Sequence, residues 1–357
     1  MNKINNINEL EDTISLEEDI IVPEGLLPSY EVRSCADLYR MHKSEQLQIQ
    51  PDFQRNFVWK PQTQTRFIDS LVKKLPIPSL FIGMDYKTEK YIIIDGLQRI
   101  STIIKFLDNP KWRLTRLPDI DERISGKKIS DINEKHPDLY SRVENLSIPV
   151  TIIRYDSSKQ DSIDYLFTIF HRLNTGGQKL NNQEIRNCIY SGKFNNMLRE
   201  IAQSNEWEDA MGKLYKINRL EGEELILRTF AFVDKLDQYT GNLSKFLNHY
   251  MTEKKDIDDS ELKQKKESLL SALSIISVKI DNIEAIYKMG RTVREALLVG
   301  IIKNITYLSS CNDEKIKDIF DQFINDEEFS DDKLRAGLAQ KANVQTRLSK
   351  SITIFAG

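Results

Sequence analysis

The sequence predicts an α+β protein in which a mixed α/β lobe is followed by an α-helical lobe. From about residue 28 to residue 205, strand-like stretches alternate with stretches of helical periodicity. Beyond residue 206 the apolar stretches all have helical spacing, with short polar turns between them. At 357 residues the chain is long enough for two cores. We therefore expect an acidic flexible arm over 1–27, a mixed domain over 28–205 and an α-helical domain over 206–357.

The first lobe begins with a helix bounded by prolines. Pro61 stands at the helix start and Pro76 at its stop. The apolar side chains between them share one face, namely Phe67, Ile68, Leu71, Val72 and Leu75. Two apolar runs over 79–85 and 90–95 then flank a polar turn at 86–89, which predicts an antiparallel hairpin of buried strands.

The hairpin leads into a second helix and the rest of the lobe. The helix has an apolar stripe of Leu97, Ile100, Ile103, Ile104 and Leu107. A charged connector over about 108–144 precedes a strand over 146–156 and a helix over 162–173. After a loop at 174–180, Asn181 and Glu184 are spaced as the cap and partner of another helix start.

The second lobe is predicted from helical periodicity alone. Five segments carry it: 223–236, 243–251, 261–280, 294–309 and 314–324. Their apolar faces need one another to be buried, so we expect them to form a helical domain.

Composition excludes several protein classes. The 51 Lys and Arg against 54 Asp and Glu give a net charge of −3, so no overall basic field attracts the chain to nucleic acid or a membrane surface. Cys35, Cys188 and Cys311 form no CxxC pair, which argues against a zinc ribbon and against a disulfide scaffold. The polar N-terminus does not resemble a signal peptide, and no apolar run approaches the ~20 residues that span a bilayer. We expect a soluble, cytoplasmic protein with no membrane partner.

The junction "IIIDGLQRIS" is the first candidate site. A strand that ends in Asp95-Gly96 and turns at once into a helix exposes free N–H groups where the helix dipole favours an anion. Gly96 allows a ligand to approach the backbone, and Arg99 suits a phosphate. Asp95 would then hold Mg²⁺ or an attacking water. The alternative is that Asp95 caps the helix in an ordinary turn and Arg99 is a surface residue.

Two further polar stretches favour the site. "QPDFQRNFVWKP" places Gln54 and Arg55 in a probable loop, and "FHRLNTGGQKLNNQEIR" places Arg172 and Asn174 beside two glycines. Three separate loops with an arginine next to an amide or a glycine suit the gripping of several phosphate oxygens. Basic groups at Lys263, Lys265 and Lys266, and at Lys213, Lys216 and Arg219, are candidate DNA contacts, although a charge run is more often a solvated helix face.

The four blocks "PDFQRNFVW", "FIDSLVKKLPIPSLFI", "IIDGLQRISTI" and "FHRLNTGGQKLNNQEIR" resemble, in order and spacing, the DUF262 domain. This is the N-terminal domain of GmrSD-type modification-dependent restriction systems, which is similar to the ParB/sulfiredoxin fold. The resemblance covers about residues 30–240 and implies that the DGQQR block, here Asp95 to Arg99, binds and hydrolyses a nucleotide. It further implies that Gln54, Arg55, Gly96, Gln98, Arg172 and Asn174 line the site.

Two departures from the family pattern bear on activity. Leu97 replaces the usual first Gln and falls on the apolar stripe, so we expect it to pack inward and leave the phosphate-facing residues in place. Full-length GmrSD-type proteins end in a domain resembling HNH nucleases, which needs histidines. This chain has four histidines, scattered at 42, 136, 171 and 249. We expect no intrinsic nuclease activity.

Three functions remain open from the sequence. The first is a Mg²⁺-dependent NTP-binding and NTP-hydrolysing regulator of a bacterial restriction or anti-phage defence system, acting with a separately encoded nuclease or effector. The second is a non-catalytic DNA-sensing or antitoxin-like subunit that binds phosphate without turnover. The third is a ParB-like DNase. Asp95 distinguishes the first two, because only a hydrolase needs its carboxylate for chemistry.

Overall fold

The protein divides into two compact units, which we describe separately. The structure is a computed structural model that describes residues 28–49, 59–173, 180–212, 220–280, 283–330, 333–334 and 337–357. The sheet unit extends to Leu180 and the helical unit begins at Asn181. We expected the division near residue 205, but α9 and α10 pack against α12 and so belong with the helical unit. The α+β class is confirmed, and the expected arm over 1–27 lies outside the described residues.

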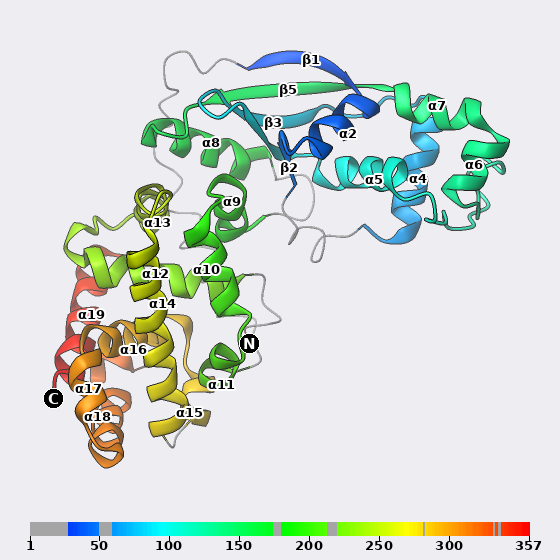
Figure 1. The fold of residues 1–357 in the computed structure, drawn as a ribbon. Coiled ribbons are helices and arrows are strands. Elements are labelled where there is room, and N and C mark those ends of the chain that lie inside the picture. Colours follow the sequence, from blue (N-terminus) through cyan, green and yellow to red (C-terminus); the bar gives the residue numbers. More distant parts are fainter. Residues whose placement is uncertain are drawn as a thin grey trace. The chain divides into compact units, whose positions relative to one another are not determined.

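The sheet unit is built on one mixed sheet of five strands in the order β1-β5-β3-β4-β2 (Figure 1). β1 and β5 are antiparallel, β5 and β3 parallel, β3 and β4 antiparallel, and β4 and β2 parallel. The strands are β1 (Ser29–Ser34), β2 (Leu47–Gln48), β3 (Leu80–Asp85), β4 (Lys90–Asp95) and β5 (Ser147–Tyr155). The helices are α2 (Cys35–Lys43), α4 (Pro61–Val72), α5 (Leu97–Asp108), α6 (Ile129–Lys135), α7 (Pro137–Asn145) and α8 (Gln160–Leu173).

Strand alternation divides the sheet into two buried faces. Leu80, Ile93 and Val150 belong to the core shared with α2, α4 and α5. The neighbouring positions Ile94 and Ile153 point to the other side and are also buried. Helix α8 packs against β4 and β5. Its buried side chains Ile163, Leu166, Phe167 and Phe170 cover that second face of the sheet.

Sequence signals located the central elements and missed the short ones. Pro61 occupies the first turn of α4, and Asn181 with Glu184 forms a capping box on α9, as predicted. The 79–85 and 90–95 hairpin is confirmed as β3 and β4. The segment 108–144, expected as a connector, contains α6 and α7. These helices have 7 and 9 residues, which is shorter than the window over which helical periodicity is recognised. β1, α2 and β2 were also not anticipated.

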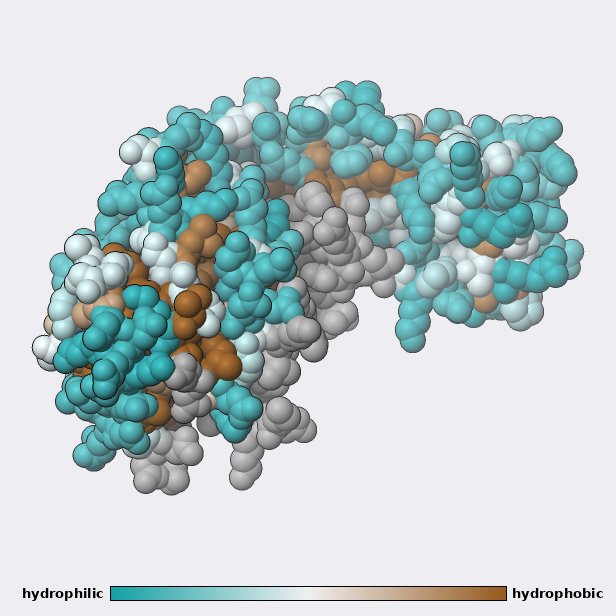
Figure 2. Space-filling model, turned by 60° about the horizontal axis from the view of Figure 1, so that its bottom comes forward, coloured by the Kyte–Doolittle hydropathy of each residue, from teal (hydrophilic) through white to brown (hydrophobic). Residues whose placement is uncertain are grey.

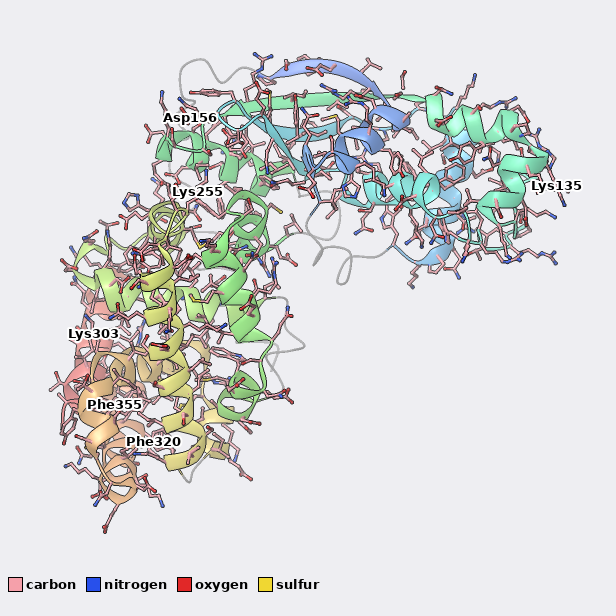
Figure 3. All side chains as sticks on the ribbon, viewed as in Figure 1. Lys135, Asp156, Lys255, Lys303, Phe320 and Phe355 are labelled. Carbon is pink, nitrogen blue, oxygen red and sulfur yellow. The ribbon has the colours of Figure 1, made fainter. Side chains whose placement is uncertain are left out.

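The helical unit contains no strand in the part of the chain that the structure describes. Its helices are α9 (Asn182–Ile189), α10 (Lys193–Ala202), α11 (Asn205–Met211), α12 (Glu221–Lys235), α13 (Leu243–Glu253), α14 (Asp259–Ser274), α15 (Ile283–Lys288), α16 (Arg291–Lys303), α17 (Ile305–Ser310), α18 (Asp313–Asn325) and α19 (Lys341–Phe355). Figure 3 labels Phe320 on α18 and Phe355 on α19, and the Phe323 ring lies 5.4 Å from that of Phe355. Across the described ranges, no helix has the length and apolar character needed to cross a membrane.

Buried charges hold the centre of the helical unit. Every residue of α9 is buried although most are polar. Arg186 Nε donates to Asn248 Oδ1 at 2.9 Å, and its Nη1 lies 3.7 Å from a carboxylate oxygen of Glu224. Glu224 also pairs with Arg228 and Arg291. Burial alone would raise the pKa of Glu224, but these three arginines hold the pKa below its ordinary value. The carboxylate therefore stays charged inside the unit.

This network predicts a large loss of stability when one partner is removed. Arg186→Ala should lower the free energy of unfolding by about 3–5 kcal/mol, because it leaves a buried carboxylate with less compensation. Arg142→Ala, which breaks an exposed pair with Asp138 on α7, should cost less than about 1 kcal/mol. Urea unfolding followed by circular dichroism measures both. Equal losses in the two variants would show that the buried network is not a major source of stability.

Candidate functional site

The junction between β4 and α5 has the backbone that a phosphate site requires. Gly96 adopts φ +97°, and α5 begins at the next residue without a side-chain cap. A Cβ at position 96 would overlap Leu80 Cδ2 of the core, so both the backbone conformation and the lack of space require glycine. No side chain caps the amide groups of the first turn of α5, which is the arrangement in which a helix N-terminus can bind an anion. The alternative in which Asp95 caps this helix is not met, since no side chain caps it.

Arg99 turns back onto the junction. Its Nη1 donates to the carbonyl of Pro78, and its Nη2 donates to the carbonyl of Ser79 at 3.3 Å and to Asp95 Oδ2 at 3.0 Å. Its side chain is 12% exposed, so the alternative that Arg99 is a surface residue is wrong. Burial lowers the pKa of Arg99, and the Asp95 carboxylate only partly opposes this. Arg99 thus joins the end of β4 to the segment that enters β3.

Asp95 presents a more open carboxylate. Its side chain is 40% exposed, and Arg99 holds one of its oxygens. Among the described residues no group of three His, Cys, Asp or Glu side chains is placed to bind a metal ion. Mg²⁺ commonly takes one or two carboxylates and completes its shell with phosphates and waters. Asp95 therefore fits a Mg²⁺ ion that arrives with a nucleotide, and does not by itself form a protein metal site.

Gln98 connects the junction to a second predicted block. Its Oε1 accepts a hydrogen bond of 3.0 Å from the Trp59 backbone N–H. The carbonyl of Trp59 accepts one of 2.9 Å from Gln64, whose own Oε1 accepts one from Lys105. Trp59 is the first described residue after the stretch that holds Gln54 and Arg55, and these two lie outside the described residues. The structure thus brings the end of that block to the junction, and assigns Gln98 a positioning contact.

The third predicted block approaches from α8. Arg172 is exposed in the last turn of α8, and Asn174 lies outside the described residues. Because α8 follows β5 and packs against β4 and β5, it runs back along the sheet. Its 14 residues span about 21 Å, roughly six strand residues, which directs Arg172 toward the end of the sheet where β4 ends. Whether Arg172 reaches a ligand at Asp95 stays a prediction.

Leu97 packs inward, as predicted. It is partly buried against the core of the sheet unit. The departure from the family pattern at this position therefore does not change the hydrogen bonds of Gln98 and Arg99.

Two further carboxylates, Asp85 and Asp156, lie at the other end of the sheet. Asp85 is the last residue of β3 and Asp156 follows the parallel strand β5, a place where ligands often bind, and Figure 3 shows Asp156 at the end of β5. Asp85 accepts from Thr88 and from the Lys87 backbone, and Asp156 accepts from Tyr86 Oη at 2.6 Å and from Ser158. Burial would raise the pKa of Asp156, but the hydrogen bonds lower it to about 2. These carboxylates accept hydrogen bonds from the turns that follow β3 and β5, and so stabilise those turns.

A basic hairpin is the surface feature that the sequence analysis missed. Residues 111–117 run antiparallel to 125–129, with the Leu114 N–H donating to the Lys127 carbonyl at 2.9 Å and Arg113 bridged to Lys128. Five exposed cations on it have no ion-pair partner among the described residues: Lys111, Arg113, Arg116, Lys127 and Lys128. Figure 2 shows a largely hydrophilic surface at this end of the unit, around α6 and α7. The segment 110–130 holds six basic and three acidic residues, a local excess hidden by the negative net charge of the chain.

The lysines proposed for DNA contact are mostly neutralised. Lys265 is buried and pairs with Asp234 at 2.6 Å, Lys266 pairs with Glu200 at 3.1 Å, and Lys263 lies 3.7 Å from Glu267. Lys213, Lys216 and Arg219 lie outside the described residues. The described lysines of this set, all on α14, therefore take part in ion pairs and do not form a free basic patch.

Comparison with known proteins supports the family resemblance. Residues 35–191 match the family described as GmrSD restriction endonuclease, N-terminal domain. The match includes the junction at 95–99 and extends past Leu180 through the buried helix α9. No curated protein and no solved structure matches the chain.

The geometry of the junction predicts a specific sensitivity at Gly96. Gly96→Ala should lower the free energy of unfolding by about 2–4 kcal/mol, because it adds left-handed backbone strain and overpacks Leu80. Gly290→Ala is the matched control, since a Cβ there would meet nothing within 4 Å and φ is −67°. It should change stability by less than about 1 kcal/mol in the same thermal and urea unfolding experiments. A Gly96→Ala variant as stable as the control would contradict the described turn.

Proposed function

Taking residues 35–191 as a GmrSD-type N-terminal domain, we propose that this chain binds a nucleoside triphosphate at the β4–α5 junction and hydrolyses it. The nucleotide state would regulate a partner in a restriction or anti-phage defence system. The observation that carries the proposal is the uncapped start of α5 after a left-handed glycine, with Asp95 and Arg99 beside it. The family match supports the coarser statement, a role in restriction or defence.

Each residue of the junction has a separate task in this proposal. The amides of the first turn of α5 bind phosphate oxygens, and Gly96 supplies the left-handed turn that starts the helix without a side-chain cap. Arg99 holds Asp95 in place and adds positive charge close to the phosphates. Gln98 holds the Trp59 backbone at the site. Mg²⁺, held by Asp95, would neutralise phosphate charge when bound.

The effector of the proposed regulator would be a separately encoded nuclease. A nucleotide-dependent change in affinity for that nuclease would be the regulatory output.

Two variants separate binding from chemistry. Asp95→Asn should leave NTP affinity within several-fold of wild type and abolish measurable phosphate release, because the amide cannot hold Mg²⁺ or orient water. Arg99→Ala should weaken binding roughly ten- to a hundredfold, because it removes the positive charge beside the phosphates and the hydrogen bond that holds Asp95. Asp138→Asn removes the same kind of i,i+4 Asp–Arg pair on α7 and should change neither property. Calorimetry gives affinities, and a phosphate assay gives turnover.

The outcomes divide the hypotheses. If the wild type binds an NTP with Mg²⁺ but releases no phosphate, the hydrolase proposal fails and a binding subunit replaces it. If a thermal-shift screen of all NTPs shows no stabilisation, where a ligand at 100 times its dissociation constant adds about 2.7 kcal/mol, the junction is only a structural turn.

The basic hairpin supports a second candidate function, a DNA-sensing subunit. Cations without partners on one exposed hairpin are the kind of surface that contacts a phosphate backbone without reading sequence. Backbone hydrogen bonds between its two segments fix the positions of Arg113, Lys127 and Lys128. Such a surface would let the chain sense DNA whether or not the nucleotide is hydrolysed.

A charge-matched pair of double variants tests this second function. Lys127→Glu with Lys128→Glu should weaken duplex DNA binding at least about tenfold. It should also reduce the slope of log affinity against log salt concentration by the equivalent of about two phosphate contacts. Lys263→Glu with Lys288→Glu makes the same charge change on exposed helix positions and should have less than about a threefold effect. Fluorescence anisotropy across salt concentrations measures both. Equal weakening by the two pairs would mean that net charge, and not the hairpin, decides DNA binding.

A further inference from the structure

The outer strand of the sheet unit carries a pairing edge. β1 has β5 on one side, and among the described residues no strand lies beyond it. The Cys35 N–H donates to the Leu146 carbonyl at 3.1 Å, which continues the register of Ser34 opposite Ser147. Backbone groups in an antiparallel pair alternate in direction, so the odd-numbered residues of β1 bond to β5. The N–H and C=O groups of Tyr30 and Val32 therefore point away from the sheet.

The bond pattern on the far side of β5 agrees with this assignment. The Tyr86 N–H donates to the Tyr155 carbonyl, so odd-numbered positions of β5 face β3. Even-numbered positions of β5 are then the ones that face β1, as the register of Glu31 opposite Val150 requires. The direction of the free groups on β1 thus rests on two independent hydrogen bonds.

The side chains of the same two residues are unusually exposed for apolar groups. Tyr30 is 81% exposed and Val32 is 68% exposed, on one face of β1. The opposite face carries Glu31 and Arg33, which pair with each other at 2.7 Å, and Arg33 also reaches Asp37 of α2. An edge with free backbone groups and an apolar face is a template for another strand.

We propose that β1 pairs antiparallel with β1 of a second copy of this chain, in the register that places Val32 opposite Val32. Outward-pointing residues must face each other in such a pair, which limits the possible registers. In the proposed one, Glu31 lies opposite Arg33 of the second copy, and Arg33 lies opposite its Glu31. In the neighbouring register, with Tyr30 opposite Val32, Glu31 would face Glu31, and like charges directly opposite destabilise a strand pair. Charge complementarity therefore selects a symmetric pair.

The dimer would join the two sheets into one continuous sheet and bring the exposed apolar side chains of the two copies side by side on one face. Val32 of each copy would meet at the centre, with Tyr30 beside Val32 of the other copy. A single pair of six-residue strands is a small interface, so we expect a reversible dimer with a dissociation constant on the order of 10 µM. This pairing does not depend on nucleotide binding, and it holds or fails separately from the proposed function.

Sedimentation of the full chain between about 1 and 200 µM tests the proposal, with the concentration range set by the expected affinity. Wild type should shift from monomer to dimer across that range. Val32→Lys should remain monomeric, because two lysines would face each other. Val278→Lys, the same substitution at another exposed valine, should dimerise like wild type. A wild type that stays monomeric at the highest concentration, or a Val32→Lys variant that still dimerises, overturns the pairing.

A charge-reversal experiment tests the register itself. Glu31→Arg and Arg33→Glu should each abolish self-association, since each places like charges opposite each other in a homodimer. Mixed together, the two variants should form a heterodimer, because every cross-strand pair then joins opposite charges. Arg33→Glu also loses the contact with Asp37, so circular dichroism melts of each variant establish that it is folded. Two folded variants that do not associate when mixed would refute the register.

Discussion

The left-handed turn at Gly96 is the constraint on which the candidate site depends. It ends β4 and starts α5 within one residue, in a space that Leu80 leaves too small for a Cβ. The same turn places Arg99 where it can bond Asp95 and the carbonyls that precede β3. Uncapped helix amides, a partly exposed carboxylate and a mostly buried guanidinium thus result from one backbone conformation. A glycine-dependent junction of this kind fixes the backbone from which the side chains of a site extend.

Arginines beside amides have two different roles in this chain. Arg99, next to Gln98, is partly buried at the proposed site and holds a carboxylate in position. Arg186, next to Gln183 and Asn187 in space, is fully buried and compensates Glu224 inside the helical unit. Both fall within the residues that match the GmrSD N-terminal family. The matched pattern therefore combines residues suited to a ligand with residues that stabilise a fold, and sequence alone does not separate the two.

Much of the fold was predictable, because the central elements carry strong local signals. Pro61, the hairpin over 79–95 and the capping box at Asn181 each specify an element without help from distant residues. The short elements depend on tertiary contacts, as α6 and α7 do, so periodicity did not identify them. The junction was found as a candidate site, but the inward turn of Arg99 was not, since its acceptors at Pro78 and Ser79 are distant in sequence.

By itself, the sequence determined that strands and helices alternate before a helical region, that Leu97 belongs to a core, and that Asp95-Gly96 starts a helix. These features depend on neighbours within a few residues and on the periodicity of apolar side chains. Only the tertiary structure decided which charges are free and which are compensated. It buried Lys265 against Asp234 and left Lys127 and Lys128 unpaired on a hairpin. The physical reason is that an ion pair or an exposed edge depends on the residues that folding brings into contact, and these lie far apart along the chain.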